Sequence, residues 1–195
     1  MKVLIKGTLA GGVIAFIWCI ISWMVIPWHA IAYNSFKSES SVQTVLQRNV
    51  DEPGIYLMPS IEEMDKKSEE PSDARHRGNG ASKQIFIFAA IDPHMTQGFS
   101  PVTFIISLAS LFVIAFFVTA LTKATRIVHY FSRLIFIGGI AFTGGLMIYL
   151  PLWNWMHFSP MYVALHLIDH VITWLLAGIA IAGVTRRTPH VVGLQ

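Results

Sequence analysis

Residues 160–184, PMYVALHLIDHVITWLLAGIAIAGV, form an apolar stretch that carries two histidines and an aspartate. At about 1.5 Å of rise per residue, a helix needs roughly 20 apolar residues to cross a hydrocarbon core of about 30 Å. An ionised side chain at the centre of such a helix costs about 2.5–3.5 kcal/mol. The stretch is long enough to span a bilayer, so Asp169 must meet protein, water or an ion rather than lipid.

The composition of the whole chain supports a membrane protein. Of its 195 residues, 54% are hydrophobic and only 13% are charged, whereas soluble domains carry about 25% charged residues. The formal net charge is +3, but the basic residues lie at the ends of apolar stretches, so topology explains them and we expect no nucleic-acid partner. The single cysteine, Cys19, excludes an intrachain disulfide and any cysteine-based metal motif.

Four apolar stretches predict four transmembrane helices, at 7–28, 101–121, 134–150 and 160–184, the third ending before Pro151. In the first stretch, small residues recur every four positions and so share one helical face, where another helix can approach closely: Gly7, Gly11, Ala15 and Cys19. This apolar run is longer than the roughly 7–15 residues usual in a signal peptide, which favours an uncleaved anchor.

The distribution of basic residues predicts the orientation of these helices. An even number of crossings places both termini on one side of the membrane. Seven basic residues fall on that side and no acidic residue accompanies them: Lys2, Lys6, Lys123, Arg126, Arg133, Arg186 and Arg187. The positive-inside rule therefore predicts a multi-pass protein with both termini in the cytoplasm and with residues 33–100 outside.

Residues 33–100 differ from the rest of the chain, because ten of its eleven acidic residues fall there. The pattern predicts a short helix at 40–48, strands at 55–58 and 84–91, and a flexible loop at 60–82. A two-stranded sheet alone is marginally stable in water. Its second strand is apolar on both faces, at Ile85, Phe86, Ile87 and Phe88. We therefore expect one face to dock on the membrane helices and these residues to bind a partner subunit or a second copy.

The expected fold is an all-α membrane bundle of four transmembrane helices, with a small α+β periplasmic insertion between helices 1 and 2. The expected organisation is a first transmembrane helix in 1–32, a periplasmic ectodomain in 33–100, helices 2–4 in 101–185 and a cytoplasmic tail in 186–195.

The histidines and aspartate of the last helix form a candidate site. His166 and His170 are four residues apart, so they share a helical face, and Asp169 is adjacent. Two imidazoles at this spacing can bind one metal ion, with the carboxylate as a further ligand. The alternatives are a b-type haem held from two helices, a proton-handling cluster, or structural hydrogen bonds to hydroxyls of the bundle. The candidate hydroxyls are Ser22, Ser107, Ser110 and Thr173.

Three further histidines are expected at the outer membrane interface, from which His166 enters the membrane: His29, His94 and His157.

The sequence gives little indication of a catalytic motif. The sequence HLIDH lacks the glutamate of the H-E-x-x-H zinc proteases, and neither a G-x-S-x-G motif nor a nucleotide-binding glycine motif is present. We therefore expect a protein that is not an enzyme.

The chain resembles, from end to end, an uncharacterised family of small four-helix bacterial inner-membrane proteins. The resemblance rests on GTLAGGVIAFIWCIISWMVIPWH, GIYLMP, IFIFAAIDP, PLWNWMHFSPMY and DHVITWLLAG. It implies a location in the bacterial inner membrane and, since no activity is assigned to the family, no catalytic residues.

Two functions follow as expectations. The first is a non-enzymatic inner-membrane accessory or scaffold subunit that presents its periplasmic domain to a partner. That partner is another membrane or periplasmic protein or a second copy of the chain, in addition to membrane lipid. The alternative is a metal-binding, haem-binding or proton-handling membrane protein that uses His166, Asp169 and His170. The sequence specifies no particular cofactor.

Overall fold

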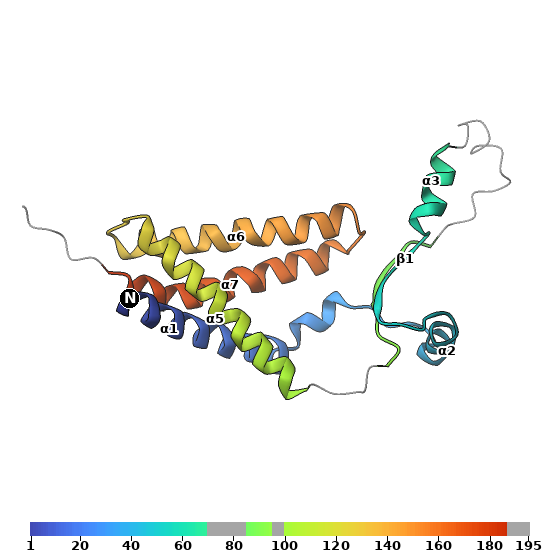
Figure 1. Cartoon of the computed structure of the whole chain (residues 1–195), viewed down its shortest axis with the longest axis horizontal. Coiled ribbons are helices and arrows are strands. Elements are labelled where there is room, and N and C mark those ends of the chain that lie inside the picture. Colours follow the sequence, from blue (N-terminus) through green and yellow to red (C-terminus); the bar gives the residue numbers. More distant parts are fainter. Residues whose placement is uncertain (70–84, 95–99, 187–195) are drawn as a thin grey trace, which may run out of the picture. The chain divides into compact units, whose positions relative to one another are not determined.

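The computed structural model describes residues 1–69, 85–94 and 100–186. The chain divides into two compact units (Figure 1). The first, which we call the helix unit, comprises Met1–Asn34 and Phe99–Gln195, and the second, the sheet unit, comprises Ser35–Gly98. The described chain is mostly helical, and it holds four helices that are long and apolar enough to cross a membrane. This confirms the prediction of four helices that are long and apolar enough to span a membrane.

The first span is α1 (Lys2–Ile20), extended by a π-helix, η1 (Ile21–Val25). The others are α5 (Pro101–Ala124), α6 (Tyr130–Asn154) and α7 (Pro160–Val184). Both α5 and α7 begin with proline after a serine N-cap, as the side chains of Ser100 and Ser159 each accept a backbone N–H bond. The bounds of α7 are those predicted.

Helix α6 is longer at both ends than the predicted 134–150, since it begins at Tyr130 and continues past Pro151 to Asn154. Proline donates no hydrogen bond to the carbonyl four residues earlier, and its ring crowds that carbonyl. Here the N–H of Trp155 still donates to the Pro151 oxygen at 2.9 Å. The helix therefore accommodates proline in its last turn.

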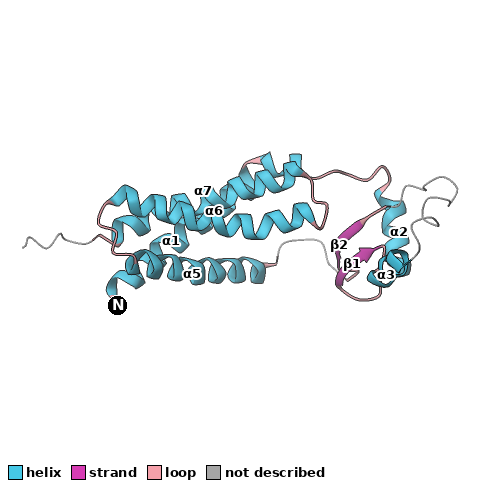
Figure 2. Cartoon of the chain, turned by 90° about the horizontal axis from the view of Figure 1, so that it is seen from above, coloured by secondary structure: helices cyan, strands magenta, loops and turns pink. Residues whose placement is uncertain are grey.

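Helices α1 and α7 contact each other at the centre of the helix unit, with α5 packed mainly on α1 and α6 mainly on α7 (Figures 1 and 2). Close approach depends on small residues. Gly7 faces Thr119 of α5, and a Cβ at Gly11 would lie 2.7 Å from the Cδ1 atom of Ile181 in α7. Ala15 is fully buried. The predicted small-residue face of the first helix is confirmed for these three positions, while Cys19 is only partly buried.

The helix unit has two ends, which we name by what lies there. The terminal end holds Met1, the α5–α6 connection and Arg186, and the stalk end holds the start of α7 and the segment leaving α1. The apolar core fills the half nearer the terminal end, with these members: Ala15, Ala115, Val118, Ile137, Ala141, Trp174, Ala177, Ile181 and Ala182.

Arg133 closes the core at the terminal end. Its side chain is fully buried, and its Nε donates to the Ala182 oxygen at 3.0 Å. Its Nη1 donates to the oxygens of Ile127 and Val128 at 3.1 and 2.6 Å. These carbonyls belong to a helix end and a loop, where backbone acceptors lack helical partners. The guanidinium thus joins α6, α7 and the connecting loop.

The sheet unit contains α2 (Glu39–Asn49), β1 (Gly54–Met58), α3 (Ile61–Glu69) and β2 (Ile87–Ile91). The two strands, magenta in Figure 2, pair antiparallel, with Gly54 opposite Ile91 and Met58 opposite Ile87. The predicted helix at 40–48 and the predicted strand at 55–58 are confirmed within one residue at each end. The second strand begins at Ile87 rather than at 84, which lies outside the described residues.

Residues 61–69 are helical, although the sequence favoured a flexible loop at 60–82. The reason is a capping box, in which Ser60 is followed three residues later by glutamate. The N–H of Glu63 donates to the Ser60 Oγ at 3.3 Å. Glu62 and Lys66 are also spaced four residues apart, which stabilises a helix. The remainder of the predicted loop, 70–82, lies outside the described residues.

The strand register defines the two faces of the sheet. Paired residues share a face and alternate residues change face, so the paired Met58 and Ile87 lie on one side. Continuing the alternation beyond the start of β2 assigns Ile85 to the same side. Met58, Ile85 and Ile87 are exposed by 46%, 67% and 40%. Phe86 and Phe88 lie on the other side and are half-buried.

Candidate functional site

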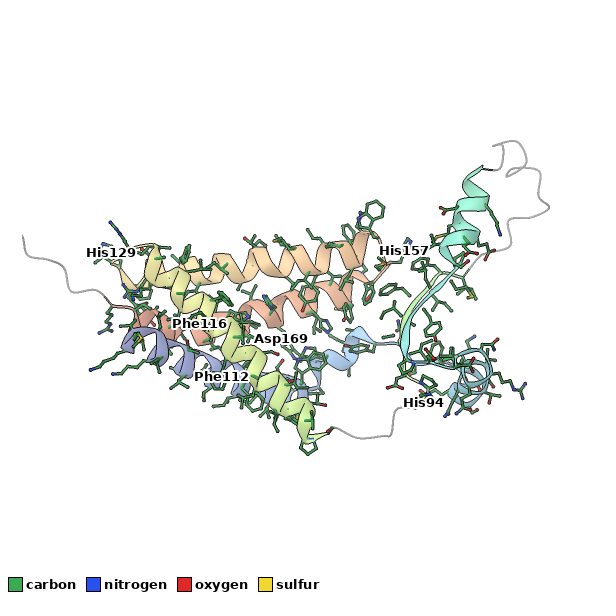
Figure 3. The ribbon with its side chains drawn as sticks, viewed as in Figure 1. His94, Phe112, Phe116, His129, His157 and Asp169 are labelled. Atoms are coloured by element: carbon green, nitrogen blue, oxygen red, sulfur yellow. The ribbon has the colours of Figure 1, made fainter. Side chains whose placement is uncertain are left out.

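Asp169 lies in α7 within the helix unit (Figure 3) and is the centre of a polar and aromatic group that we call the stalk cluster. The cluster joins α7 to the end of α1 and to the segment 27–34, which we call the stalk. Its members are Trp18, Ser22, His29, Tyr33, His166 and Asp169.

The Asp169 carboxylate is held by side chains from the far end of α1 and from the stalk. Its Oδ1 accepts a hydrogen bond from the Trp18 Nε1 at 2.8 Å and another from the Ser22 Oγ at 2.7 Å. Its Oδ2 lies 3.4 Å from the His29 Nε2. Hydrogen-bond donors of this kind are what a carboxylate at membrane depth requires. The carboxylate is therefore satisfied by protein.

The π-helix η1 explains how His29 reaches this position. The N–H of Ile26 donates to the Ile21 oxygen at 2.9 Å, instead of to the Ser22 oxygen as an α-helix would require. The next residue, Pro27, has no N–H to donate. The Ser22 oxygen is thus left for side chains, and it accepts the Trp28 Nε1 and faces the His29 Nδ1, each at 3.2 Å.

His29 occurs in a short 3₁₀-helix, η2 (Pro27–Ala32), and its side chain is only 7% exposed. Because a carbonyl can only accept, the Nδ1 facing Ser22 carries the proton and Nε2 is the nitrogen directed at Asp169. The Nε2 makes no hydrogen bond among the described residues, although it lies within ion-pair distance of Oδ2. The two groups therefore form a close pair that is poorly aligned for a hydrogen bond. The Trp23 ring stacks on the imidazole, with centroids 4.0 Å apart.

His166 extends the cluster toward Tyr33 of the stalk. Its Nδ1 donates to the Tyr162 oxygen at 2.8 Å, one turn earlier in α7. Its Nε2 is then the acceptor for the Tyr33 hydroxyl at 3.4 Å. The rings of His29 and His166 lie 5.3 Å apart. Partial burial, reinforced by Tyr162 nearby, raises the pKa of the Tyr33 phenol above its ordinary value.

The predicted metal trio does not converge on one point. His166 and Asp169 face the stalk cluster, whereas His170 faces α6, where its ring lies against Tyr149 and the Gly145 backbone. Within residues 1–69, 85–94 and 100–186, no group of three or more histidine, cysteine or acidic side chains is arranged to hold a metal ion. The metal assignment for His166, Asp169 and His170 gains no geometric support.

The contacts support the alternative in which the polar residues of α7 make structural hydrogen bonds within the bundle. Ser22 bonds the carboxylate as that alternative proposed, and Thr173 donates to the backbone oxygen of Asp169 at 2.8 Å. Ser110 instead donates to Ile106 of its own helix. Of the histidines expected near His166, His29 joins it, with ring centroids 5.3 Å apart. His94 belongs to the sheet unit and contacts the Asp51 oxygen there.

The sequence placed His29 at the same membrane interface as His166, but it identified neither Trp18 and Tyr33 as partners of α7 nor the contact of His29 with Asp169. Proline at 27 indicated that the first helix ends there, and the tryptophans around it suggested a membrane interface. Neither signal reveals a π-turn. The position of His29 depends on that turn. Its contact with Asp169 is therefore a tertiary contact that cannot be predicted from helical periodicity.

The geometry of the cluster does not provide a nucleophile. Ser22, His29 and Asp169 are the residue types of a hydrolase triad, but the Ser22 hydroxyl donates to the carboxylate rather than to the imidazole. Ser22 is also fully buried. A serine nucleophile needs its base within hydrogen-bond reach and an accessible oxygen. The arrangement instead holds two chain segments together.

Comparisons with protein-family models, with curated proteins and with solved structures find no match to this chain.

Proposed function

We propose that this chain is a non-enzymatic accessory or scaffold subunit of the bacterial inner membrane. In this proposal the helix unit is an anchor with cytoplasmic termini, and the sheet unit binds a partner protein in the periplasm. The chain would serve by holding its partner at a fixed place on the membrane.

One observation carries the proposal. The side chains around the Asp169 carboxylate come from the far end of α1 and from the stalk, and His166 contacts the stalk again through Tyr33. The buried polar groups of α7 therefore act on the connection that leads to the sheet unit. Asp169, the one acidic residue in the apolar helices, thus holds the stalk, and this arrangement is suited to positioning an ectodomain.

The exposed face of the sheet unit supports the second half of the proposal. Met58, Ile85 and Ile87 present branched or flexible apolar side chains on one side of an open, two-stranded sheet. Neighbouring apolar side chains of this kind are typical of protein-binding surfaces. The predicted partner-binding set thus divides, with Ile85 and Ile87 as the exposed members and Phe86 and Phe88 on the opposite face.

The proposed positioning role of the helix unit can be tested by measuring the mobility of the stalk. A spin label would be placed at Ile31, which is exposed, in a chain whose only cysteine has been changed by Cys19→Ser. We expect an immobile label in the otherwise wild-type chain and in Asp169→Asn, and a mobile one in Asp169→Leu, because leucine accepts no hydrogen bond. Equal mobility in all three proteins would contradict a positioning role for Asp169.

The proposed binding of a partner protein by the sheet unit can be tested by photo-crosslinking in native membranes. A crosslinking amino acid at Ile87 is expected to give one discrete adduct with another protein, and Ile85→Asp should abolish it. The matched control carries the crosslinker at Val45 of α2, which is also exposed, and should not give that adduct. Adducts only with lipid, or equal adducts at both positions, would refute a partner-binding face.

A proton-handling site is a second candidate, favoured by the approach of the His29 Nε2 to the Asp169 Oδ2. Conduction across the membrane would need a chain of polar groups beyond Asp169. The buried hydroxyls toward the terminal end, at Thr119, Thr122 and Thr185, each donate to carbonyls of their own helix. The buried Arg133 guanidinium likewise donates to backbone carbonyls. Proton flux into proteoliposomes, compared with Asp169→Asn, separates the two candidates. Flux that the substitution removes would favour proton handling over positioning. Elemental analysis and a search for a Soret band test the metal and haem alternatives.

A further inference from the structure

A groove of about 420 Å³ lies between α1 with η1 and α5, in the stalk-end half of the helix unit. Its walls are mostly apolar, including Phe16, Trp23 and Met24, but three small polar groups also line it: Cys19, Thr103 and Ser107. All of these residues belong to candidate membrane spans. What the groove meets in a membrane is therefore the lipid phase rather than water.

The two hydroxyls in the groove differ from others on the same helix. Ser110, Thr119 and Thr122 each donate to the carbonyl four residues earlier, at 2.7–2.8 Å. Thr103 and Ser107 make no side-chain hydrogen bond within the described part of the chain. A hydroxyl facing hydrocarbon without an acceptor is unfavourable. These two donors consequently favour a ligand that brings an oxygen acceptor into an otherwise apolar groove.

The depth of these hydroxyls limits the kind of ligand. Helix α5 has 24 residues, so at about 1.5 Å per residue it exceeds a hydrocarbon core of about 30 Å, and its first turn lies in the interfacial layer. Thr103 is in that turn, and Ser107 is one turn deeper. This is the level at which the ester carbonyls of a phospholipid give way to its acyl chains.

We propose that the groove is a binding site for one membrane phospholipid, with an acyl chain against Phe16 and Met24. An ester carbonyl of that lipid accepts hydrogen bonds from Thr103 and Ser107. The Trp23 ring forms part of the groove wall and stacks on His29 of the stalk cluster. A bound chain therefore also supports the ring that covers the His29 imidazole. The site does not depend on the proposed scaffold function.

The test compares lipid retention by matched variants of the full chain. Protein in mild detergent would be mixed with palmitoyl-oleoyl-phosphatidylglycerol and examined by native mass spectrometry. We expect one retained lipid per wild-type chain and at least about fivefold weaker retention in Ser107→Leu, which fills the groove and removes a donor. Ser110→Leu makes the same substitution on the same helix outside the groove and should retain lipid as the wild type does.

Two further measurements keep the result interpretable. Ser107→Ala removes the hydroxyl without adding volume, and it should fold normally while retaining less lipid. Cys19 is the only cysteine, so its alkylation by a maleimide reports on the groove directly, and added lipid should slow it in the wild type. Equal lipid retention in wild type and Ser107→Leu would overturn the proposal. So would alkylation of Cys19 that is unaffected by lipid, or a groove filled by a helix of another protein.

Discussion

The contact between α1 and α7 is made in two different ways along its length. In the terminal-end half, Gly11 receives the Ile181 side chain and the neighbouring core is built from alanines. In the stalk-end half, Asp169 meets an indole, a hydroxyl and an imidazole. Lipid supplies little drive for apolar helices to associate, so close packing and interhelical hydrogen bonds must supply it. Helix α7 therefore packs closely on α1 in one half, and in the other it hydrogen-bonds to the end of α1 and to η1 and lies against the stalk.

The two halves of this contact should therefore tolerate different substitutions. Steric packing fails when an atom is added, whereas a polar cluster fails when a donor or acceptor loses its counterpart. An isosteric substitution should therefore separate the two halves.

Gly11→Leu should be the most damaging single change in the helix unit. Even a Cβ at this position would lie 2.7 Å from Ile181, so a leucine forces the helices apart and should cost about 3 kcal/mol or more. The matched control is Gly139→Leu on α6, where an added Cβ meets nothing within 4 Å. Unfolding in detergent measures both. Similar losses for the two variants would show that close packing at Gly11 contributes little.

Asp169→Leu should cost about 2 kcal/mol of unfolding free energy, because the Trp18 and Ser22 donors would be left buried without an acceptor. Asp169→Asn keeps an acceptor oxygen for both donors and offers an amide to the His29 Nε2, so it should cost much less. The same unfolding assay compares the three proteins. If leucine proved as stable as aspartate, the hydrogen bonds of the cluster would not hold the helices together.

Ser22→Ala should cost about 1 kcal/mol. The change removes the hydroxyl that donates to Asp169 and accepts from Trp28, while the Ser22 oxygen keeps its contacts with Trp28 and His29. Ser110→Ala is the control, since that hydroxyl bonds only within α5 and its loss should be almost neutral. A larger loss at Ser110 than at Ser22 would reverse the expected order.

Tyr33 should give the smallest effect, seen in its titration. Since burial raises the pKa of its phenol, the neutral form is favoured in the folded chain. Its contribution to stability is present below the pKa of unfolded tyrosine and is lost as the pH rises through the higher folded value. Ultraviolet difference titration of the wild type and Tyr33→Phe isolates this group. Ionisation of Tyr33 at or below the pH of an ordinary tyrosine would contradict the burial.

Much of the architecture was predictable from the sequence, because the bilayer fixes helix length and the small-residue spacing fixes a packing face. Asp169 was identifiable because a charge at membrane depth demands a partner. Ser22 was among the hydroxyls expected to bond this cluster, and it does bond Asp169. The contact with His29 was not predicted, since His29 arrives through a π-turn that leaves no periodic signal. The helix α3 was missed although Ser60 and Glu63 form a capping box, because the polar composition of that segment suggested a loop.

The π-helix also determines which kinds of genetic change the stalk can accept. Each residue of an α-helix advances the chain by about 100° around its axis. Deleting one residue between Ser22 and Ile26 would turn the bond from the Ile26 N–H to the Ile21 oxygen into an ordinary α-helical bond. Every residue after the deletion would be turned by about that angle, and the imidazole of His29 would leave Asp169. The segment therefore functions as a spacer of fixed length, in which the number of residues matters more than the identity of most of them.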